Sequence, residues 1–218
     1  MMDFTQISGV QIPGALPVRD IAADSGRLWR VYDAEVEYIE ATGNQYIDTG
    51  IGITPAYRVE ADFEFTQVST KQQRVFEQYD TSGHLFAALY LNGSGKIGYA
   101  WDQNKVWSGV NVAISARRRW YVLDGPNRLL KVGATEEQLP LVADTGPPDT
   151  ATLKLGSHDT GTKPTYGKWY SAKISLGGVL VRDLHPVRCG SVGCLYDRVS
   201  GTLFPSLGAD PFLAGADI

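Results

Sequence analysis

The chain has 218 residues, a formal net charge of −4 and a sequence pI of about 5.4. It carries no basic field that would hold a nucleic-acid backbone, and no apolar run reaches the ~18 residues of a membrane span. Nucleic-acid binding and helical membrane insertion are therefore not expected. The 24 glycines, the 11 prolines and the many aromatic residues favour a β-sandwich over a helical fold.

Residues 1–35 differ in pattern from the rest of the chain. They hold two short apolar segments, "VRDIA" and "RLWRVY", separated by the turn-forming "ADSG". This pattern predicts an N-terminal arm or hairpin that precedes one domain over 36–218, with Leu28 and Trp29 docked on the body or on a neighbouring chain. The start lacks the charged and apolar regions of a secretory signal, so we expect a chain that is made without a signal or has lost it.

From Val36 onward, short runs of alternating polarity are separated by turn residues, which predicts antiparallel strands in a sandwich or barrel. Tight type I′ turns are expected at Gly177–Gly178 and at Ser200–Gly201. No segment has a convincing helical period, although 133–142 could hold one short turn. The predicted strands are 36–40, 45–49, 57–65, 73–79, 84–91, 96–101, 118–124, 128–133, 151–156, 168–176, 179–187 and 194–199.

The stretch "RVEADFEF" places Glu60, Asp62 and Glu64 on one face of a predicted strand. A retaining glycosidase needs two carboxyl groups about 5–5.5 Å apart. Alternate residues on a strand are about 6.6–7 Å apart, so Glu60 and Glu64 are separated by roughly twice that distance. We therefore expect these acids to form a solvated strand face, with the intervening apolar residues in the core: Val59, Ala61, Phe63 and Phe65.

Four phrases in the chain resemble a known group of modules. They are "EYIEATGNQYIDTGI" (37–51), "KWYSAKISLGGVLVRDLHPVR" (168–188), "GCLYDRVSGTLF" (193–204) and "GADPFLAG" (208–215). They are similar to the concanavalin A-like, laminin-G-like jelly-roll modules of gut bacteria and their phages. The resemblance implies an all-β antiparallel sandwich. The segment 18–30 is similar to short leaders in phage structural proteins.

A short hairpin-like region, "YAWDQNKVWSGVN", combines aromatic and polar residues in the way that a sugar site does. Aromatic rings support the apolar face of a sugar, and Asp and Asn side chains bind its hydroxyls. In the alternative, one or both tryptophans of this region cap the core or an interface. Trp120 and Trp169 lie inside apolar runs and are expected in the core. The candidate ligand-binding residues are Tyr99, Trp101, Asp102, Asn104, Trp107 and Asn111.

No cofactor is predicted apart from a candidate Ca²⁺ ion. Asp102, Asn104 and Asp159 are its candidate ligands, since relatives of this fold often hold Ca²⁺ in loops and Ca²⁺ prefers oxygen donors. Cys189 and Cys194 are expected to be either two half-buried thiols beside a turn or a small disulfide loop. Two cysteines alone do not build a structural zinc site.

These observations predict a non-catalytic carbohydrate-recognition module with a host cell-surface or mucin-type glycan as its partner. The resemblance places it in a phage, prophage or cell-surface adhesion protein, either virion-associated or extracellular. The alternative is a virion structural or decoration protein, in which the arm mediates oligomerisation or binds a virion partner. A glycoside hydrolase is the minor alternative, because the chain has no defensible carboxylate pair. Serine or cysteine catalysis has little support, because the chain has no G-x-S-x-G motif and neither cysteine lies beside a histidine in sequence.

Overall fold

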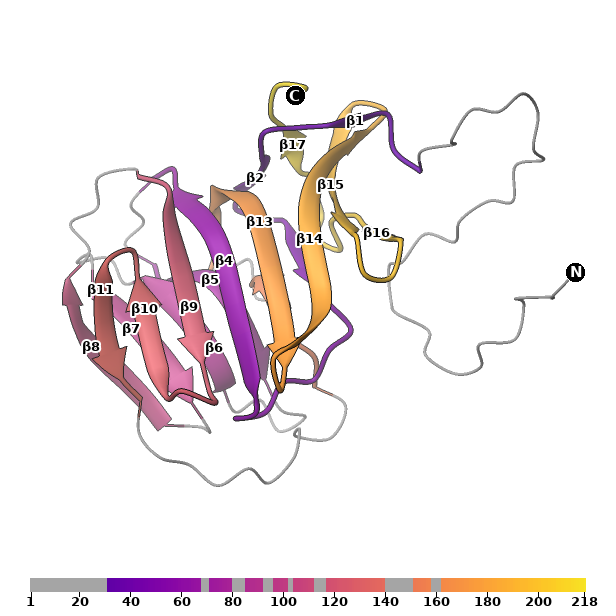
Figure 1. The fold of residues 1–218 in the computed structure, drawn as a ribbon. Coiled ribbons are helices and arrows are strands. Elements are labelled where there is room, and N and C mark those ends of the chain that lie inside the picture. Colours follow the sequence, from indigo (N-terminus) through magenta and orange to yellow (C-terminus); the bar gives the residue numbers. More distant parts are fainter. Residues whose placement is uncertain are drawn as a thin grey trace, which may run out of the picture.

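The computed structural model describes residues 31–67, 71–79, 85–91, 96–101, 104–111, 117–139, 151–157 and 162–218. Within these ranges every regular element is a β-strand, and all strand pairs are antiparallel, which confirms the predicted all-β class. The strands form two sheets that lie face to face as a sandwich (Figure 1). No helix in the described ranges is long and apolar enough to cross a membrane.

The larger sheet has eleven strands among the described residues, in the order β11-β10-β9-β4-β13-β14-β15-β16. Strand β13 is its centre: one edge pairs with β4 along its length, and the other pairs with β2 and then β14. Strand β1 pairs with β14, and β17 pairs with β2. The bounds are β1 Ala34–Glu35, β2 Ile39–Thr42, β4 Tyr57–Phe65, β9 Arg119–Asp124, β10 Leu129–Val132, β11 Thr135–Gln138, β13 Tyr166–Leu176, β14 Val179–Cys189, β15 Val192–Asp197, β16 Thr202–Phe204 and β17 Leu213–Ala214.

The smaller sheet has six strands among the described residues, in the order β3-β12-β5-β6-β7-β8. Its last four strands follow one another along the chain as a meander, because each pairs with its sequence neighbour. This sheet lies behind the larger one in Figure 1. The bounds are β3 Tyr46–Asp48, β12 Lys154–Gly156, β5 Gln73–Tyr79, β6 Leu85–Leu91, β7 Lys96–Trp101 and β8 Asn104–Asn111.

The core fills the space between the two sheets. The four apolar residues of β4 are buried there, as the alternation predicted: Val59, Ala61, Phe63 and Phe65. Trp169 is also confirmed as a core residue, with its ring centroid 4.7 Å from that of Phe63 and 6.0 Å from that of Phe212. Gly167 is required beside them, because a Cβ at this position would lie 2.1 Å from the Phe63 ring.

The two predicted tight turns have different outcomes. Gly177 and Gly178 have φ values of 56° and 82°, as a type I′ turn requires. The second prediction is wrong, because Gly201 has a positive φ of 73° and Ser200 does not. Strands β15 and β16 end on the pair Asp197 and Thr202. The Asp197 carboxylate accepts hydrogen bonds from the backbone N–H groups of residues 199 and 200, which stabilises a longer loop.

The segment 133–142 also differs from its prediction. Residues 135–138 form the edge strand β11, where a helical turn was the alternative, and β11 pairs with β10 in register from Val132↔Thr135 onward. An edge strand pairs on one side only and can be polar throughout. The sequence "TEEQ" therefore shows no alternation of apolar residues that would predict a strand.

The described part of the N-terminal region joins the larger sheet. Ala34 and Glu35 pair with Arg188 and Val187 of β14, and Asp33 N donates to the Arg188 carbonyl. Residues 1–30, which include Leu28 and Trp29, lie outside the described ranges. The predicted docking of those two side chains therefore stays a prediction.

Candidate functional site

Tyr99 was predicted to bind a ligand, but its side chain lies in the core. Only 2% of it is exposed, and it packs in the same cluster as Ile97 and Leu89. Burial raises the pKa of its phenol, with a smaller contribution from Glu137. The phase of β7 turns alternate residues toward the other sheet, so Tyr99 does not belong to an open aromatic surface.

Four other predicted residues, Trp101, Asn104, Trp107 and Asn111, are placed only by their backbone. Strands β7 and β8 form the expected hairpin, in which Trp101 pairs with Asn104 and Gly98 pairs with Trp107; Asn111 pairs with the first residue of β7. Asp102 and Asp159 lie outside the described residues, so the calcium site stays a prediction. Within the described ranges, no group of three His, Cys, Asp or Glu side chains gathers in a way that could hold a metal ion.

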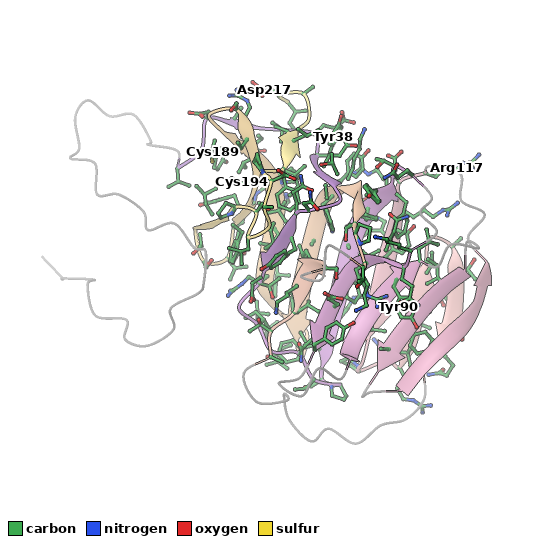
Figure 2. All side chains as sticks on the ribbon, turned by 180° about the vertical axis from the view of Figure 1, so that it is seen from behind. Tyr38, Tyr90, Arg117, Cys189, Cys194 and Asp217 are labelled. Carbon is green, nitrogen blue, oxygen red and sulfur yellow. The ribbon has the colours of Figure 1, made fainter. Side chains whose placement is uncertain are left out.

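A different surface lies on the outer face of the larger sheet, where β9, β4 and β13 run side by side (Figure 1). We call it the outer-face patch and define it by the following side chains: Tyr38, Asp62, Glu64, Arg118, Trp120, Lys168 and Tyr170. They come from β4, β9 and β13 and from the residues just before β2 and β9. Tyr38 and Arg117, which precedes the patch residue Arg118, lie at the same end of the sandwich in Figure 2.

Trp120 is the most exposed aromatic group of the patch. The prediction that it lies in the core is wrong, because Trp120 has a relative exposure of 41%. Tyr121 and Leu123 are the members of β9 that turn inward, so Trp120 must face outward. Its Cα partner on the neighbouring strand is Asp62.

A β-bulge in β13 positions Tyr170. Trp169 pairs with Phe63 and Ser171 pairs with Asp62, so Tyr170 is an extra residue between two ladder positions. A bulge of this kind changes where a side chain points without ending the strand. It keeps Trp169 in the core and brings the Tyr170 hydroxyl onto the outer face, where it donates a 2.8 Å hydrogen bond to Glu64 Oε2.

Arg118 joins these strands electrostatically. Its Nε lies 3.0 Å from each carboxylate oxygen of Asp62, and its Nη2 lies 2.7 Å from Oδ2. Its guanidinium carbon lies 4.0 Å from the centroid of the Tyr170 ring, a cation–π contact. The hydrogen bonds to Asp62 raise the pKa of Arg118. Asp62 is thus nearly enclosed while Arg118 remains half exposed, with side-chain exposures of 6% and 53%.

Lys168 and Tyr38 extend the patch toward β2. The Lys168 ammonium lies 4.0 Å from the centroid of the Tyr38 ring, and the Tyr38 and Tyr170 rings meet edge to face with centroids 5.7 Å apart. Burial alone would lower the pKa of Lys168, but contacts with Tyr38 and nearby glutamates raise it. Burial raises the pKa of the Tyr170 phenol, and the hydrogen bond to Glu64 is the second largest cause of this rise.

The acids of β4 point outward, as predicted, but they are not freely solvated. Arg58 pairs with both Glu60 and Asp124, Arg118 pairs with Asp62, and Tyr170 donates to Glu64. The alternation indicated the face, whereas the partners come from strands far away in sequence. The alternation of polar and apolar residues along one strand carries no information about partners on other strands.

A second polar cluster lies on the outer face of the smaller sheet. Arg74 Nε lies 3.1 Å from Glu77 Oε2, and the guanidinium lies 4.4 Å from the centroid of the Tyr90 ring. Ser157 donates a 2.8 Å hydrogen bond to Glu77 Oε1. Tyr90, which is labelled in Figure 2, packs against Gly98, where a Cβ would lie 2.3 Å from its ring. All of these side chains are buried, so the cluster is closed where the outer-face patch is open.

The outer-face patch offers chemistry suited to a polar ring with an apolar face. The exposed indole of Trp120 supplies an aromatic surface, and the neighbouring Arg118 and Lys168 supply donors. Among the described residues, Arg118 Nη1 makes no hydrogen bond, so this nitrogen remains available to a ligand oxygen. Because the patch cations lie beside carboxylates, the patch has no strong net field.

Comparison with known proteins gives a likeness of fold and no family. No family model matches the chain, and no curated protein matches it. Among solved structures, the chain is similar to a candidate carbohydrate binding protein from Bacteroides ovatus, with a TM-score of 0.55 and 11% sequence identity. The likeness covers 84% of this chain and 62% of that one, so this chain spans less than two thirds of that protein's length. At this identity the likeness shows the fold, an all-β sandwich.

Proposed function

We propose that this protein recognises carbohydrate without catalysis, and that the outer-face patch is a contact surface for the sugar. The observation that carries the proposal is the exposed Trp120, placed beside Arg118 and Tyr170 on a sheet face where the carboxylates of Glu60 and Asp62 are paired with arginines. An exposed tryptophan within a strand loses the hydrophobic stabilisation that burial would give it, about 25 cal/mol for each Å² of apolar surface. A ligand that covers the ring would restore this contribution.

The carbohydrate-binding name of the Bacteroides ovatus structure supports the same class of ligand. The resemblance of the terminal phrases to laminin-G-like jelly-roll modules also supports it. The absence of catalysis is part of the proposal and is supported by the state of the acids on β4. A catalytic acid or nucleophile needs an oxygen directed at the substrate, whereas both oxygens of Asp62 accept from Arg118 and Glu60 faces Arg58.

The test is a glycan array followed by titration of the best glycan, with tryptophan fluorescence as the readout. Trp120→Ala is expected to abolish the fluorescence change and to weaken binding about two- to tenfold, the effect of losing one aromatic stacking contact. Val179→Ala is the matched control, because Val179 is also an exposed apolar residue but is the first residue of β14, at the Gly177–Gly178 turn. Undiminished binding by Trp120→Ala would move the site elsewhere, and an array without hits would refute carbohydrate recognition.

For the biological setting we propose a phage, prophage or cell-surface adhesion protein, on the basis of the leader and of the terminal phrases. A virion assembly role is the second candidate. One observation favours it: the strand ends beside the turn between β13 and β14 expose Leu176, Val179 and Leu180, with relative exposures of 39%, 68% and 38%. Light scattering of the wild type and of Val179→Ser tests this role. A stable monomer in both would count against assembly through this turn.

A further inference from the structure

We propose that Cys189 and Cys194 form an intramolecular disulfide when the chain folds in an oxidising environment. The two thiols meet on the β14–β15 hairpin, a place unrelated to the outer-face patch. Val187 pairs with Cys194, and Cys189 pairs with Val192. Residues 187 and 189 share a strand face, so the two cysteines are diagonal neighbours on one side of the hairpin.

The distance between these residues is compatible with a bond after a small adjustment. Diagonal neighbours in a sheet lie about 7–8 Å apart between Cα atoms, and a disulfide spans about 4.4–6.8 Å. The twist of a hairpin shortens one of its two diagonals. Here both side chains pack in the same small cluster, and Figure 2 shows the two labelled cysteines near one end of the hairpin. Gly190, next to Cys189, has a φ of 62° and open space around it, so the turn can adjust.

The surroundings determine when the bond can form. Cys194 is buried in a small cluster with Val187 and Leu203, while Cys189 is partly exposed. Burial raises the pKa of both thiols, and that of Cys194 reaches about 12. Since the thiolate is the reacting species, the folded and reduced protein should oxidise slowly at neutral pH. Oxidation during folding, before the cluster closes, avoids this barrier.

The reaction is balanced with a low-molecular-weight disulfide such as oxidised glutathione. The Cys189 thiolate attacks one sulfur of the oxidant and releases one glutathione thiolate, which gives a mixed disulfide. The Cys194 thiolate then attacks the Cys189 sulfur and releases the second glutathione. The protein loses two hydrogen atoms, and one oxidised glutathione becomes two reduced ones.

The bond would stabilise the β14–β15 hairpin, against which residues 31–35 pack. Val31 and Tyr32 pack on the same cluster as the two cysteines, and the Gly190 N–H donates to the Asp33 carboxylate. Closing a loop of this length lowers the entropy of the unfolded chain, which should raise the Tm by about 4–8 °C. An unchanged Tm in the oxidised protein would refute this clamping effect.

The experiment is refolding of the reduced, denatured protein with oxidised glutathione, followed by intact mass and thiol titration in denaturant. The expected product is a monomer that has lost two hydrogen atoms and has no titratable thiol. The Cys194→Ser control should stop at a glutathione adduct on Cys189. Two free thiols after refolding, or a disulfide-linked dimer on a non-reducing gel, would overturn the proposal. In the folded reduced protein, oxidation should accelerate as the pH rises, and a rate independent of pH would contradict the burial argument.

Discussion

The contact between Arg118 and Asp62 predicts that removing Arg118 lowers the free energy of unfolding more than removing the charge of Asp62. Arg118→Ala leaves a carboxylate with 6% side-chain exposure that has lost all three of its contacts with the guanidinium. Leaving a buried acceptor unsatisfied costs about 1–3 kcal/mol, and removing one partner of a fully buried pair costs about 3–5 kcal/mol. Because water can enter the space left by the half-exposed arginine, we expect about 1–3 kcal/mol for this variant.

The reverse change should cost less. Asp62→Asn keeps the shape of the side chain and leaves a guanidinium that is 53% exposed and can be solvated. The expected cost is about 0.5–1.5 kcal/mol, the usual net value of a hydrogen bond. The double variant Arg118→Ala with Asp62→Asn should be more stable than Arg118→Ala alone, since no charge then remains buried without a partner.

Urea unfolding measures these differences through the midpoint at a constant m value. For a domain of this size, the Arg118→Ala cost corresponds to a fall in Tm of roughly 2–12 °C. The reasoning is refuted if Asp62→Asn costs as much as Arg118→Ala, or if the double variant is the least stable of the three. Arg118→Lys is the matched control: it keeps the charge and loses the bidentate geometry, so its stability should fall between the other two.

Three further predictions concern the smaller sheet, the core and the ligand. Arg74→Met should cost about 3–5 kcal/mol in urea unfolding, because it removes the cation that the buried Glu77 faces, and adding Glu77→Gln should recover much of the loss. Burial raises the pKa of Tyr121 to about 12, so the unfolded chain ionises first and stability is lost as the pH rises from about 10 to 12, by about 1.4 kcal/mol per pH unit. Tyr121→Phe should remove this part of the alkaline slope, and an identical slope in both proteins would count against it. Because the patch charges are already paired, the affinity for a neutral glycan should change less than about twofold between low and high salt; a steep salt dependence would indicate an acidic ligand.

The alternation of apolar residues was enough to predict most of the fold. Strands 57–65, 73–79 and 96–101 have the predicted bounds. The first and the last show a clear period of two, whereas 73–79 has adjacent apolar residues and a register shift between Arg74 and Phe76. The Gly177–Gly178 turn was also readable, since positive φ at two successive positions demands glycine. The misses are short edge strands such as β1 and β11. Their pairing is decided by the partner strand, and their own sequences say little about it.

The candidate site could not be predicted in the same way. Trp120 sits in the apolar run "RRWYVL", so composition alone placed it in the core, yet Val122 on the same outward face is buried while Trp120 is not. Asp62 on β4 and Arg118 just before β9 are 56 residues apart in sequence. The bulge at Tyr170 contains no glycine or proline from which it could be predicted. A signal was present in the acids of β4: three carboxylates on one strand face imply cations on the adjoining strands, and "ARRRW" was the densest basic run available.

Each outer face of the sandwich carries a cluster of an arginine, a tyrosine and a carboxylate, and the two clusters differ in exposure. On the smaller sheet, Arg74 lies over Tyr90 and pairs with Glu77, and the whole group is buried, which suits a structural role. On the larger sheet, Arg118 lies over Tyr170 and pairs with Asp62 in the same manner, but half of its side chain remains in solvent. The chemistry of the two groups is alike, so exposure is the feature that makes the outer-face patch the candidate binding surface. The outer-face patch is therefore where ligand binding is expected to be measurable, and substitutions in the Arg74 group should change stability first.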